Sequence, residues 1–303
     1  MHGETQIAQP NTVPAHRRWS SWGIDRTLVV LLGPALLVVL LLFIYPFMYG
    51  LVLSILPKEG GTFSNYTNFF SDGRERVTIL NTLRLALPAT LLNLAIAIPL
   101  TYRMRRRLRG QGPITTLFVI PMTLGTVLIA QGMLNFFGPA GWLNKILLTL
   151  GVDDQPVRLV HNYVGVLIAI MIADFPPVFL LLLGYVSGID PNLERAGQML
   201  GAGAWQRFYR IMLPLMMPGI AVAFALSFVA TFAVFPSAVL VGVPAGETRV
   251  IALAAWQAAY ERFDYSAASA IAILMAAIEL VFVAVVLIGR TRLYSGPSSG
   301  GKG

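Results

Sequence analysis

The chain has 303 residues, of which 56% are hydrophobic and only 12% are charged, and its formal net charge is +8. Soluble domains contain about a quarter charged residues, so this composition excludes an ordinary soluble domain and favours several membrane-spanning helices. The basic residues lie in short loops between apolar runs, which is typical of membrane topology and not of a nucleic-acid-binding surface.

The N-terminal part predicts a tail followed by a membrane helix. Residues 1–27 are polar, and we expect them to form a cytoplasmic tail. Residues 28–56 are almost uncharged and can span the hydrocarbon layer of about 30 Å, so they predict the first transmembrane helix, interrupted at Pro34 and Pro46. The polar residues 58–79 predict a segment outside the membrane.

The second predicted helix covers residues 81–102 and ends in an arginine cluster. Five arginines lie between Arg103 and Arg109. Basic residues are enriched in cytoplasmic loops, so the cluster predicts that this loop is cytoplasmic. A third helix over residues 114–137 and a mixed loop over residues 138–162 follow.

Three more helices are predicted over residues 163–186, 215–241 and 266–289, with a polar external segment before the last. Residues 80–290 would then form a five-helix core, followed by a flexible tail over 291–303. If both termini are cytoplasmic, 14 of the 22 lysines and arginines lie on that side. This bias supports the predicted topology.

Residues 189–213 form a water-facing segment between the fourth and fifth predicted helices. Asp190 and Pro191 predict a helix start, because Asp caps free amide groups and proline is tolerated at the first helical position. The corner after this helix and the bend back into the membrane are predicted at glycines and prolines, namely Gly201, Gly203, Pro214 and Pro218.

Gly201 begins a spaced pattern in this segment. Phe208, Ile211 and Pro214 follow it at intervals of 7, 10 and 13 residues. This pattern resembles the cytoplasmic EAA loop of the permease subunits of binding-protein-dependent ABC importers. The hydrophobic layout extends the resemblance over residues 28–290.

The resemblance implies an all-α membrane protein with six transmembrane helices, the type I ABC importer permease fold and both termini in the cytoplasm. In that family the loop forms a coupling helix that docks on the ATPase. Aligned through Gly201, the family's Glu-Ala-Ala falls on residues 195–197, which are Arg-Ala-Gly here, and Glu194 stands one position early. The resemblance assigns the docking role to Glu194, Arg195, Ala196, Gly201, Ala202, Phe208 and Pro214.

The resemblance also implies an assembly in the bacterial inner (plasma) membrane. Two ATPase subunits would bind ATP and Mg²⁺, a second, different permease chain would complete the pathway within the lipid, and a periplasmic or extracellular solute-binding protein would deliver the solute. This chain would carry no cofactor, would bind no nucleic acid and would perform no bond chemistry.

The separate first helix, the segment NYTNFF and the pattern around ERFDY look most like permeases of the spermidine/putrescine type. A small organic cation such as a polyamine is therefore the expected solute. Permeases for phosphonate, thiamine, iron(III) or another organic anion are the alternative. A secondary transporter is a further alternative, but no internal repeat is visible in the sequence.

Asp174 and Glu279 are carboxylates predicted near the bilayer midplane, where a charge is costly and often functional. They could lie on a pathway for a cationic solute. Alternatively, Asp174 could cap a helix that restarts at Asp-Phe-Pro-Pro. Glu279 could instead be protonated or paired with a neighbouring helix or chain. Asn93 and Arg84 on the second helix could face the same interior.

Other motifs favour structural interpretations. Residues 296–302 resemble a P-loop, but no helix follows, so we interpret them as a tail. Residues 197–201 have GxxxG spacing, which we interpret as a corner and not as a membrane dimer contact. The aromatic residues near the start of the last helix predict an interfacial belt or, alternatively, a contact with the solute-binding protein. They are Trp256, Tyr260, Phe263 and Tyr265.

Reactive side chains are sparse. The chain has no cysteine, and its three histidines are scattered, so neither disulfides nor a metal site are expected. No arrangement of Ser, His and Asp typical of hydrolases stands out either. The sequence therefore predicts a transport protein without a catalytic site.

Overall fold

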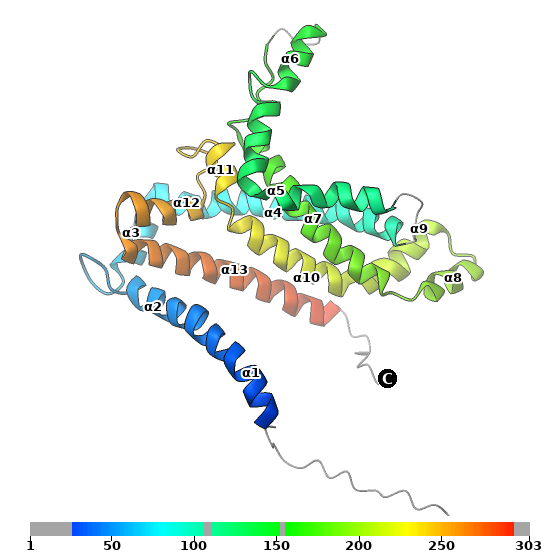
Figure 1. Ribbon diagram of the computed structural model, residues 1–303, viewed down its shortest axis with the longest axis horizontal. Coiled ribbons are helices and arrows are strands. Elements are labelled where there is room, and N and C mark those ends of the chain that lie inside the picture. Colours follow the sequence, from blue (N-terminus) through cyan, green and yellow to red (C-terminus); the bar gives the residue numbers. More distant parts are fainter. Residues whose placement is uncertain (1–25, 106–110, 152–154, 294–303) are drawn as a thin grey trace, which may run out of the picture. The chain divides into compact units, whose positions relative to one another are not determined.

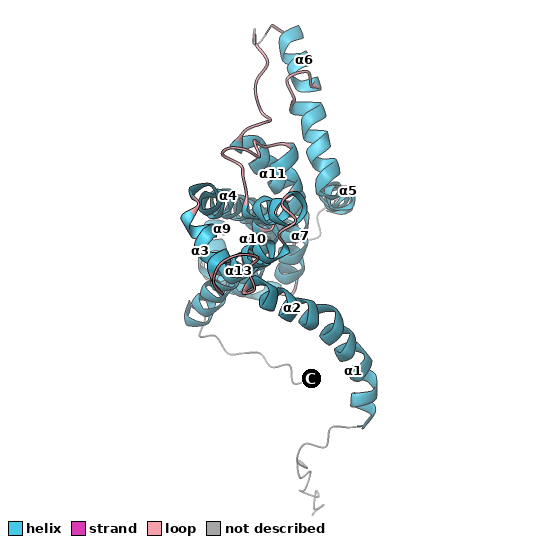
Figure 2. Cartoon of the chain, turned by 90° about the vertical axis from the view of Figure 1, so that its left-hand side faces the viewer, coloured by secondary structure: helices cyan, strands magenta, loops and turns pink. Residues whose placement is uncertain are grey.

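The computed structural model describes residues 26–105, 111–151 and 155–293, and every regular element in these ranges is helical (Figures 1 and 2). Six helical stretches in these ranges are long and apolar enough to cross a membrane, which confirms the predicted all-α fold with six transmembrane helices. Both predicted tails lie almost wholly outside the described residues. The candidate spans are Leu32–Ser54, Gly73–Met104, Gly112–Thr149, Tyr163–Ser187, Ala204–Phe232 and Tyr265–Arg290.

The chain divides into two compact units, residues 1–49 and 50–303. In the first unit, α1 (Arg26–Val39) leads into a π-helical turn, η1 (Leu40–Ile44). The next helix, α2 (Tyr45–Ser54), begins in the first unit and continues into the second. The first predicted membrane helix is therefore present with nearly the expected limits.

A π-helical turn accommodates proline in this helix. The prediction that Pro34 and Pro46 interrupt it is wrong, since α1, η1 and α2 follow one another without a break. The Tyr45 amide bonds to the Leu40 carbonyl, five residues earlier, and Pro46 comes next. A proline ring clashes with the carbonyl four residues before it, and the wider π turn relieves that clash.

Three long helices form the centre of the second unit (Figure 1). They are α4 (Gly73–Met104), α7 (Tyr163–Ser187) and α10 (Leu213–Phe232), and each packs against the other two. A fourth helix, α13 (Tyr265–Leu293), packs on α10. Close van der Waals packing of large apolar side chains holds these helices together, because lipid provides no hydrophobic driving force between membrane helices. The largest fully buried side chains include Phe179, Phe228, Phe232, Leu85 and Leu182.

The segment predicted as external over residues 58–79 is partly helical. It contains α3 (Ser64–Ser71) and the first turns of α4. Asp72 caps α4 by accepting a hydrogen bond of 2.8 Å from the Arg74 amide. The predicted start at residue 81 was too late, because the first turns of α4 are polar and lie beyond the apolar stretch.

The helix α5 (Gln111–Phe137) bends at Gly125, where φ is +70° and ψ is 163°. This backbone conformation is essentially restricted to glycine. After the bend, the chain leads into α6 (Trp142–Thr149), which stands away from α4, α7 and α10 in both views (Figures 1 and 2). The mixed loop predicted over residues 138–162 therefore contains a helix.

The fifth span differs from its prediction at both ends. A short helix, α9 (Ala204–Arg207), continues through a second π turn, η2 (Phe208–Met212), into α10. Pro214 follows η2 just as Pro46 follows η1, so it does not bend the chain. The span ends at Phe232, and α11 (Pro236–Leu240) is a separate helix that begins at a proline.

The polar segment predicted between the last two spans is also largely helical. It contains α12 (Ile251–Trp256) and a π turn, η3 (Gln257–Glu261). The apolar side of α12 packs against α13 and α4, which buries Ile251 and Ala254. The four aromatic residues predicted as a belt or a partner contact are all exposed, as either alternative requires.

We predict that Gly125→Ala lowers the stability of the chain, whereas Gly132→Ala in the same helix does not. Alanine at position 125 is strained by about 1–3 kcal/mol because of the backbone conformation. At Gly132 an added Cβ meets no atom within 4 Å, and alanine favours a helix over glycine by up to about 1 kcal/mol. Thermal unfolding of the detergent-solubilised chain measures both. If the two variants had equal midpoint temperatures of unfolding, backbone strain at position 125 would be excluded as the cause.

Candidate functional site

The EAA-like segment, residues 189–213, is a helical hairpin. Its first arm is α8 (Pro191–Met199), which begins as the sequence predicts: the Asp190 carboxylate accepts a hydrogen bond of 2.9 Å from the Asn192 amide, and Pro191 occupies the first turn. The second arm consists of α9 and η2. Figure 1 shows α8 and α9 at the end of the second unit farthest from α3 and α12.

Gly201 forms the predicted corner because of its backbone. Its φ is +81°, its amide bonds to the Gln198 carbonyl at 3.0 Å, and the Ala202 amide bonds to the Gly197 carbonyl at 3.0 Å. These two bonds define a Schellman motif, which requires a left-handed residue at this position. Gly203 has an ordinary extended conformation, so only the first of the two predicted corner glycines is required by backbone geometry.

Gly197 brings the two arms together. A Cβ on this residue would lie 2.6 Å from the Ile211 Cδ1 atom, so α8 and η2 approach closely here. Gly197 is buried in this contact. The GxxxG spacing of Gly197 and Gly201 is therefore part of the hairpin, as the sequence interpretation held.

Glu194 points into the chain and joins the hairpin to the end of α4. Only 3% of the residue is exposed. Its Oε2 lies 2.7 Å from the Arg105 guanidinium, and its Oε1 accepts a hydrogen bond of 2.8 Å from the Tyr102 hydroxyl. Arg207, on the second arm, lies 3.7 Å away. A charge this well buried is stable only when it is paired, so these contacts hold α8 against α4.

Phe208 is half-buried and also faces α4. Its ring centroid lies 4.9 Å from that of Tyr102. Beneath it, Val186, Met212 and Met216 form a fully buried cluster. Pro214, the last of the predicted docking residues, is exposed on α10.

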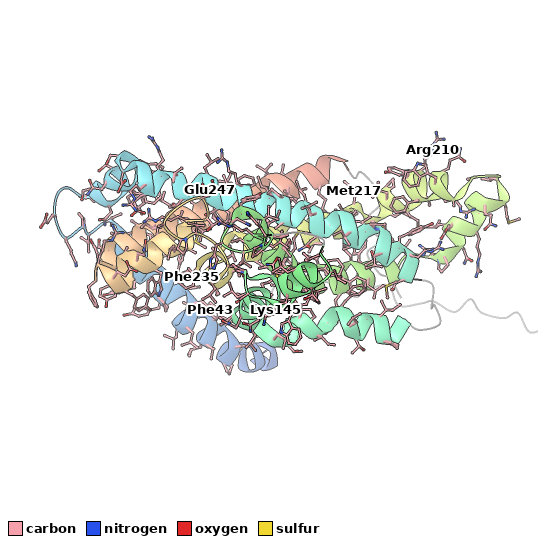
Figure 3. All side chains as sticks on the ribbon, turned by 90° about the horizontal axis from the view of Figure 1, so that it is seen from above. Phe43, Lys145, Arg210, Met217, Phe235 and Glu247 are labelled. Atoms are coloured by element: carbon pink, nitrogen blue, oxygen red, sulfur yellow. The ribbon has the colours of Figure 1, made fainter. Side chains whose placement is uncertain are left out.

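The outer side of the hairpin is apolar and exposed. Met199, Leu200 and Trp205 have exposed fractions of 89%, 87% and 71%. Arg195, Ala196 and Gly201 are also exposed, while Ala202 is half-buried. Arg210 lies at this end of the second unit, far from Phe235 and Glu247 (Figure 3). Of the predicted docking residues, only some therefore lie on a free surface.

The other predicted site residue, Asp174, lies in the middle of α7 and is 93% buried. The alternative that it caps a restarting helix is wrong, because α7 continues through Asp174 and both following prolines. Its carboxylate accepts a hydrogen bond of 3.0 Å from the Asn93 amide on α4 and another from the Ser227 hydroxyl on α10. Asp174 therefore joins all three central helices.

Threonines extend this buried polar cluster. The Thr90 and Thr231 hydroxyls lie 3.1 Å apart, and the Thr90 hydroxyl lies 3.4 Å from that of Ser227. Sequence reasoning did not identify Ser227 as a partner of Asp174, or Arg105 as a partner of Glu194. A hydroxyl can return its hydrogen bond to its own helix, so a serine or threonine in an apolar run does not reveal a neighbour.

Glu279 does not join this cluster. It lies on α13, which packs against α10, α12 and α3. Its Oε1 atom is buried and has no hydrogen-bond partner among the described residues. The two midplane carboxylates predicted on one pathway therefore lie in separate environments.

A second ionic cluster, not predicted, lies where α4 begins. Glu75 is buried and its Oε1 lies 3.2 Å from Arg249 and 3.5 Å from Arg262. Arg249 also donates to Gln257, and a polar cavity of about 400 Å³ adjoins the cluster. In the described ranges, no group of three or more His, Asp or Glu side chains is placed to hold a metal ion.

Comparison with known proteins identifies related chains. The family pattern of the binding-protein-dependent transport system inner membrane component matches residues 94–294. The spermidine/putrescine transport system permease protein PotB of Haemophilus influenzae is 31% identical over 183 residues, which are 58% of this chain and 64% of that protein. This chain thus spans just under two thirds of the length of that relative.

Two further comparisons agree on the fold. The trehalose/maltose transport system permease protein MalF of Thermococcus litoralis is 34% identical over 213 residues, which are 67% of this chain and 69% of that protein. A crystal structure of a bacterial alginate ABC transporter, in complex with an alginate pentasaccharide-bound periplasmic protein, contains a chain that superposes with a TM-score of 0.78. That chain is 23% identical, and the match covers 93% of this chain and all of the other.

We predict that Glu194→Ala loosens the hairpin. Removing one partner of a buried ion pair costs about 3–5 kcal/mol, because Arg105 is left buried without its counter-charge. Hydrogen exchange should become faster throughout α8, and thermal unfolding should begin earlier. The neighbouring substitution Arg195→Ala is the control: that side chain is exposed and should change stability by no more than about 0.5 kcal/mol. If hydrogen exchange in α8 were equally fast in the two variants, the proposed role of Glu194 in holding the hairpin to α4 would be excluded.

Proposed function

The chain belongs to the family of binding-protein-dependent transport system inner membrane components, which makes it an inner-membrane permease subunit of an ABC importer, and we propose that it conducts a small organic cation and is driven by a separate ATPase through the EAA-like segment. In this proposal both termini and the EAA-like segment are cytoplasmic. The ATPase subunits bind ATP and Mg²⁺, and this chain performs no bond chemistry.

The exposed apolar tip of the hairpin carries this proposal. Met199, Leu200 and Trp205 place large apolar side chains on a surface that the chain itself leaves uncovered. Clustered exposed apolar side chains of this kind mark protein interaction sites. A groove on an ATPase subunit would bury them, with Ala196 and Gly201 allowing close approach.

The buried contacts of the hairpin support force transmission. Glu194 and Phe208 hold the hairpin on the end of α4, while α7 enters it and α10 leaves it. A displacement of the tip is therefore carried into three packed helices at once. We propose that closure of the ATPase dimer moves this unit as a rigid body and alternates access to the pathway.

We propose the remaining partners by analogy with the family. A second permease chain would complete the pathway, and an external binding protein would deliver the solute, as the periplasmic protein in the alginate transporter structure illustrates for that complex. We propose a polyamine as solute, because PotB, a relative at 31% identity, is a spermidine/putrescine permease. The buried carboxylate of Asp174 near the middle of the span suits a cation better than an anion.

We predict that Trp205→Glu releases the ATPase. A charge at the centre of the apolar tip should weaken docking about tenfold or more, the loss expected for a large aromatic anchor. The tagged chain is purified from membranes, and the ATPase that accompanies it is identified by mass spectrometry and by ATP hydrolysis. Trp142→Glu on α6 is the matched control, since Trp142 is 68% exposed but lies away from the hairpin. Equal recovery of ATPase with both variants would exclude docking at the tip.

We also predict that cells lacking this chain lose uptake of labelled spermidine and keep uptake of labelled sulfate. Uptake should return with the wild-type chain and not with the Trp205→Glu variant, because transport needs the ATPase. Retained spermidine uptake together with loss of another solute would keep the permease assignment and overturn the proposed substrate.

A further inference from the structure

A hollow of about 360 Å³ opens between α4, α5 and α7. Its lining is almost wholly apolar and includes two phenylalanine rings, Phe118 and Phe175, whose centroids lie 5.4 Å apart. Ile96, Leu117 and Ile172 also line it. None of the described residues that line the hollow is charged.

Asn93 is the polar member of this lining. Only 1% of the residue is exposed, and its Nδ2 donates to the Asp174 carboxylate at 3.0 Å. Its Oδ1 is buried and has no hydrogen-bond partner among the described residues. A buried acceptor without a donor is unfavourable, and a bound ligand that supplies a donor would remove this cost.

Asp174 determines which end of the amide is left free. A carboxylate only accepts hydrogen bonds, so it must face the NH₂ group of Asn93 and not its oxygen. The Ser227 hydroxyl donates to the same carboxylate and holds it from the other side. Asp174 thus acts as a positioning residue that turns the Asn93 oxygen away from itself.

The surroundings of this oxygen select a class of ligand. An acyl chain of lipid fills an apolar hollow but offers no donor to the oxygen. An anion would meet no basic side chain in the lining. A protonated amine supplies an N–H donor, its methylene chain suits the aliphatic walls, and its charge is attracted to the faces of Phe118 and Phe175.

We propose that this hollow is a solute subsite in which the Asn93 oxygen accepts a hydrogen bond from a primary ammonium group whose carbon chain lies against α5 and α7. The proposal rests on the proposed transport function and specifies its substrate class. It requires that water and a charged solute reach the hollow from the pathway.

The absence of cysteine from the chain allows a direct test. Ile172→Cys, in the lining, is introduced into the full transporter in membrane vesicles. Three methanethiosulfonate reagents are compared, carrying an ethylammonium, an ethyltrimethylammonium or an ethylsulfonate group, and each rate is divided by the reagent's rate with 2-mercaptoethanol. The ethylammonium reagent should react about tenfold faster than the sulfonate, the factor that a hydrogen bond from a charged donor can contribute. The trimethylammonium reagent has no N–H group and should fall between them.

Two variants assign that preference to Asn93. Leu124→Cys, exposed on α5 but outside the hollow, should show no such preference. Adding Asn93→Leu to Ile172→Cys should make the two cationic reagents react alike. Because Asn93→Leu could disturb folding, protection is measured separately in the Asn93 background: spermidine should slow labelling of Ile172→Cys, and sulfate should not.

Each of the following results would contradict the proposed subsite. Failure of all three reagents to react at Ile172→Cys would mean that the hollow is closed to water. A sulfonate rate equal to the ammonium rate, or an equal preference at Leu124→Cys, would exclude recognition by the Asn93 oxygen. Labelling needs neither ATP nor docking, so recovery of the ATPase from the same vesicles reports on the proposed function independently.

Discussion

The structure depends on the pairing of two buried carboxylates with α4. A carboxylate removed from water must be paired or fully hydrogen-bonded, and both of these find their partners on the same helix. Asp174 bonds to Asn93 in the middle of α4, and Glu194 bonds to Arg105 at its end. The helix that enters the EAA-like hairpin and the hairpin itself are therefore held to α4 at two separate heights.

This arrangement connects the hairpin with the middle of the membrane. Ser227 brings α10 into the Asp174 cluster, so both helices attached to the hairpin share one buried polar network with α4. Closely packed interiors transmit strain from one side chain to the next. In the proposed mechanism, an ATPase that moves the hairpin would thus move the walls of the solute pathway.

In the two proposals, the same network links ATPase coupling with solute recognition. Asn93 belongs to the polar cluster through its NH₂ group and lines the apolar hollow. In the proposed subsite, the affinity for a solute bound at the Asn93 oxygen would depend on the position of Asp174. Through Asp174 it would also depend on the positions of α7 and α10. A change in helix packing would then alter the affinity of the site, which is what an importer needs in order to release its cargo.

The sequence by itself determined the fold class, the six spans and the place of the hairpin. The length of the apolar runs, the basic residues in the loops and the spacing that begins at Gly201 are local signals. They can be recognised in the sequence without knowing which residues lie close together in space. Tertiary structure decided which side chains face inward. Glu194 resembled a surface residue in the sequence, but Arg105, 89 positions away in the chain, buries it. Asp174 resembled a helix cap because prolines follow it, yet its partners on α4 and α10 keep it inside a continuous helix. Sequence proximity could not reveal these partners, because helix packing, and not chain order, brings them together.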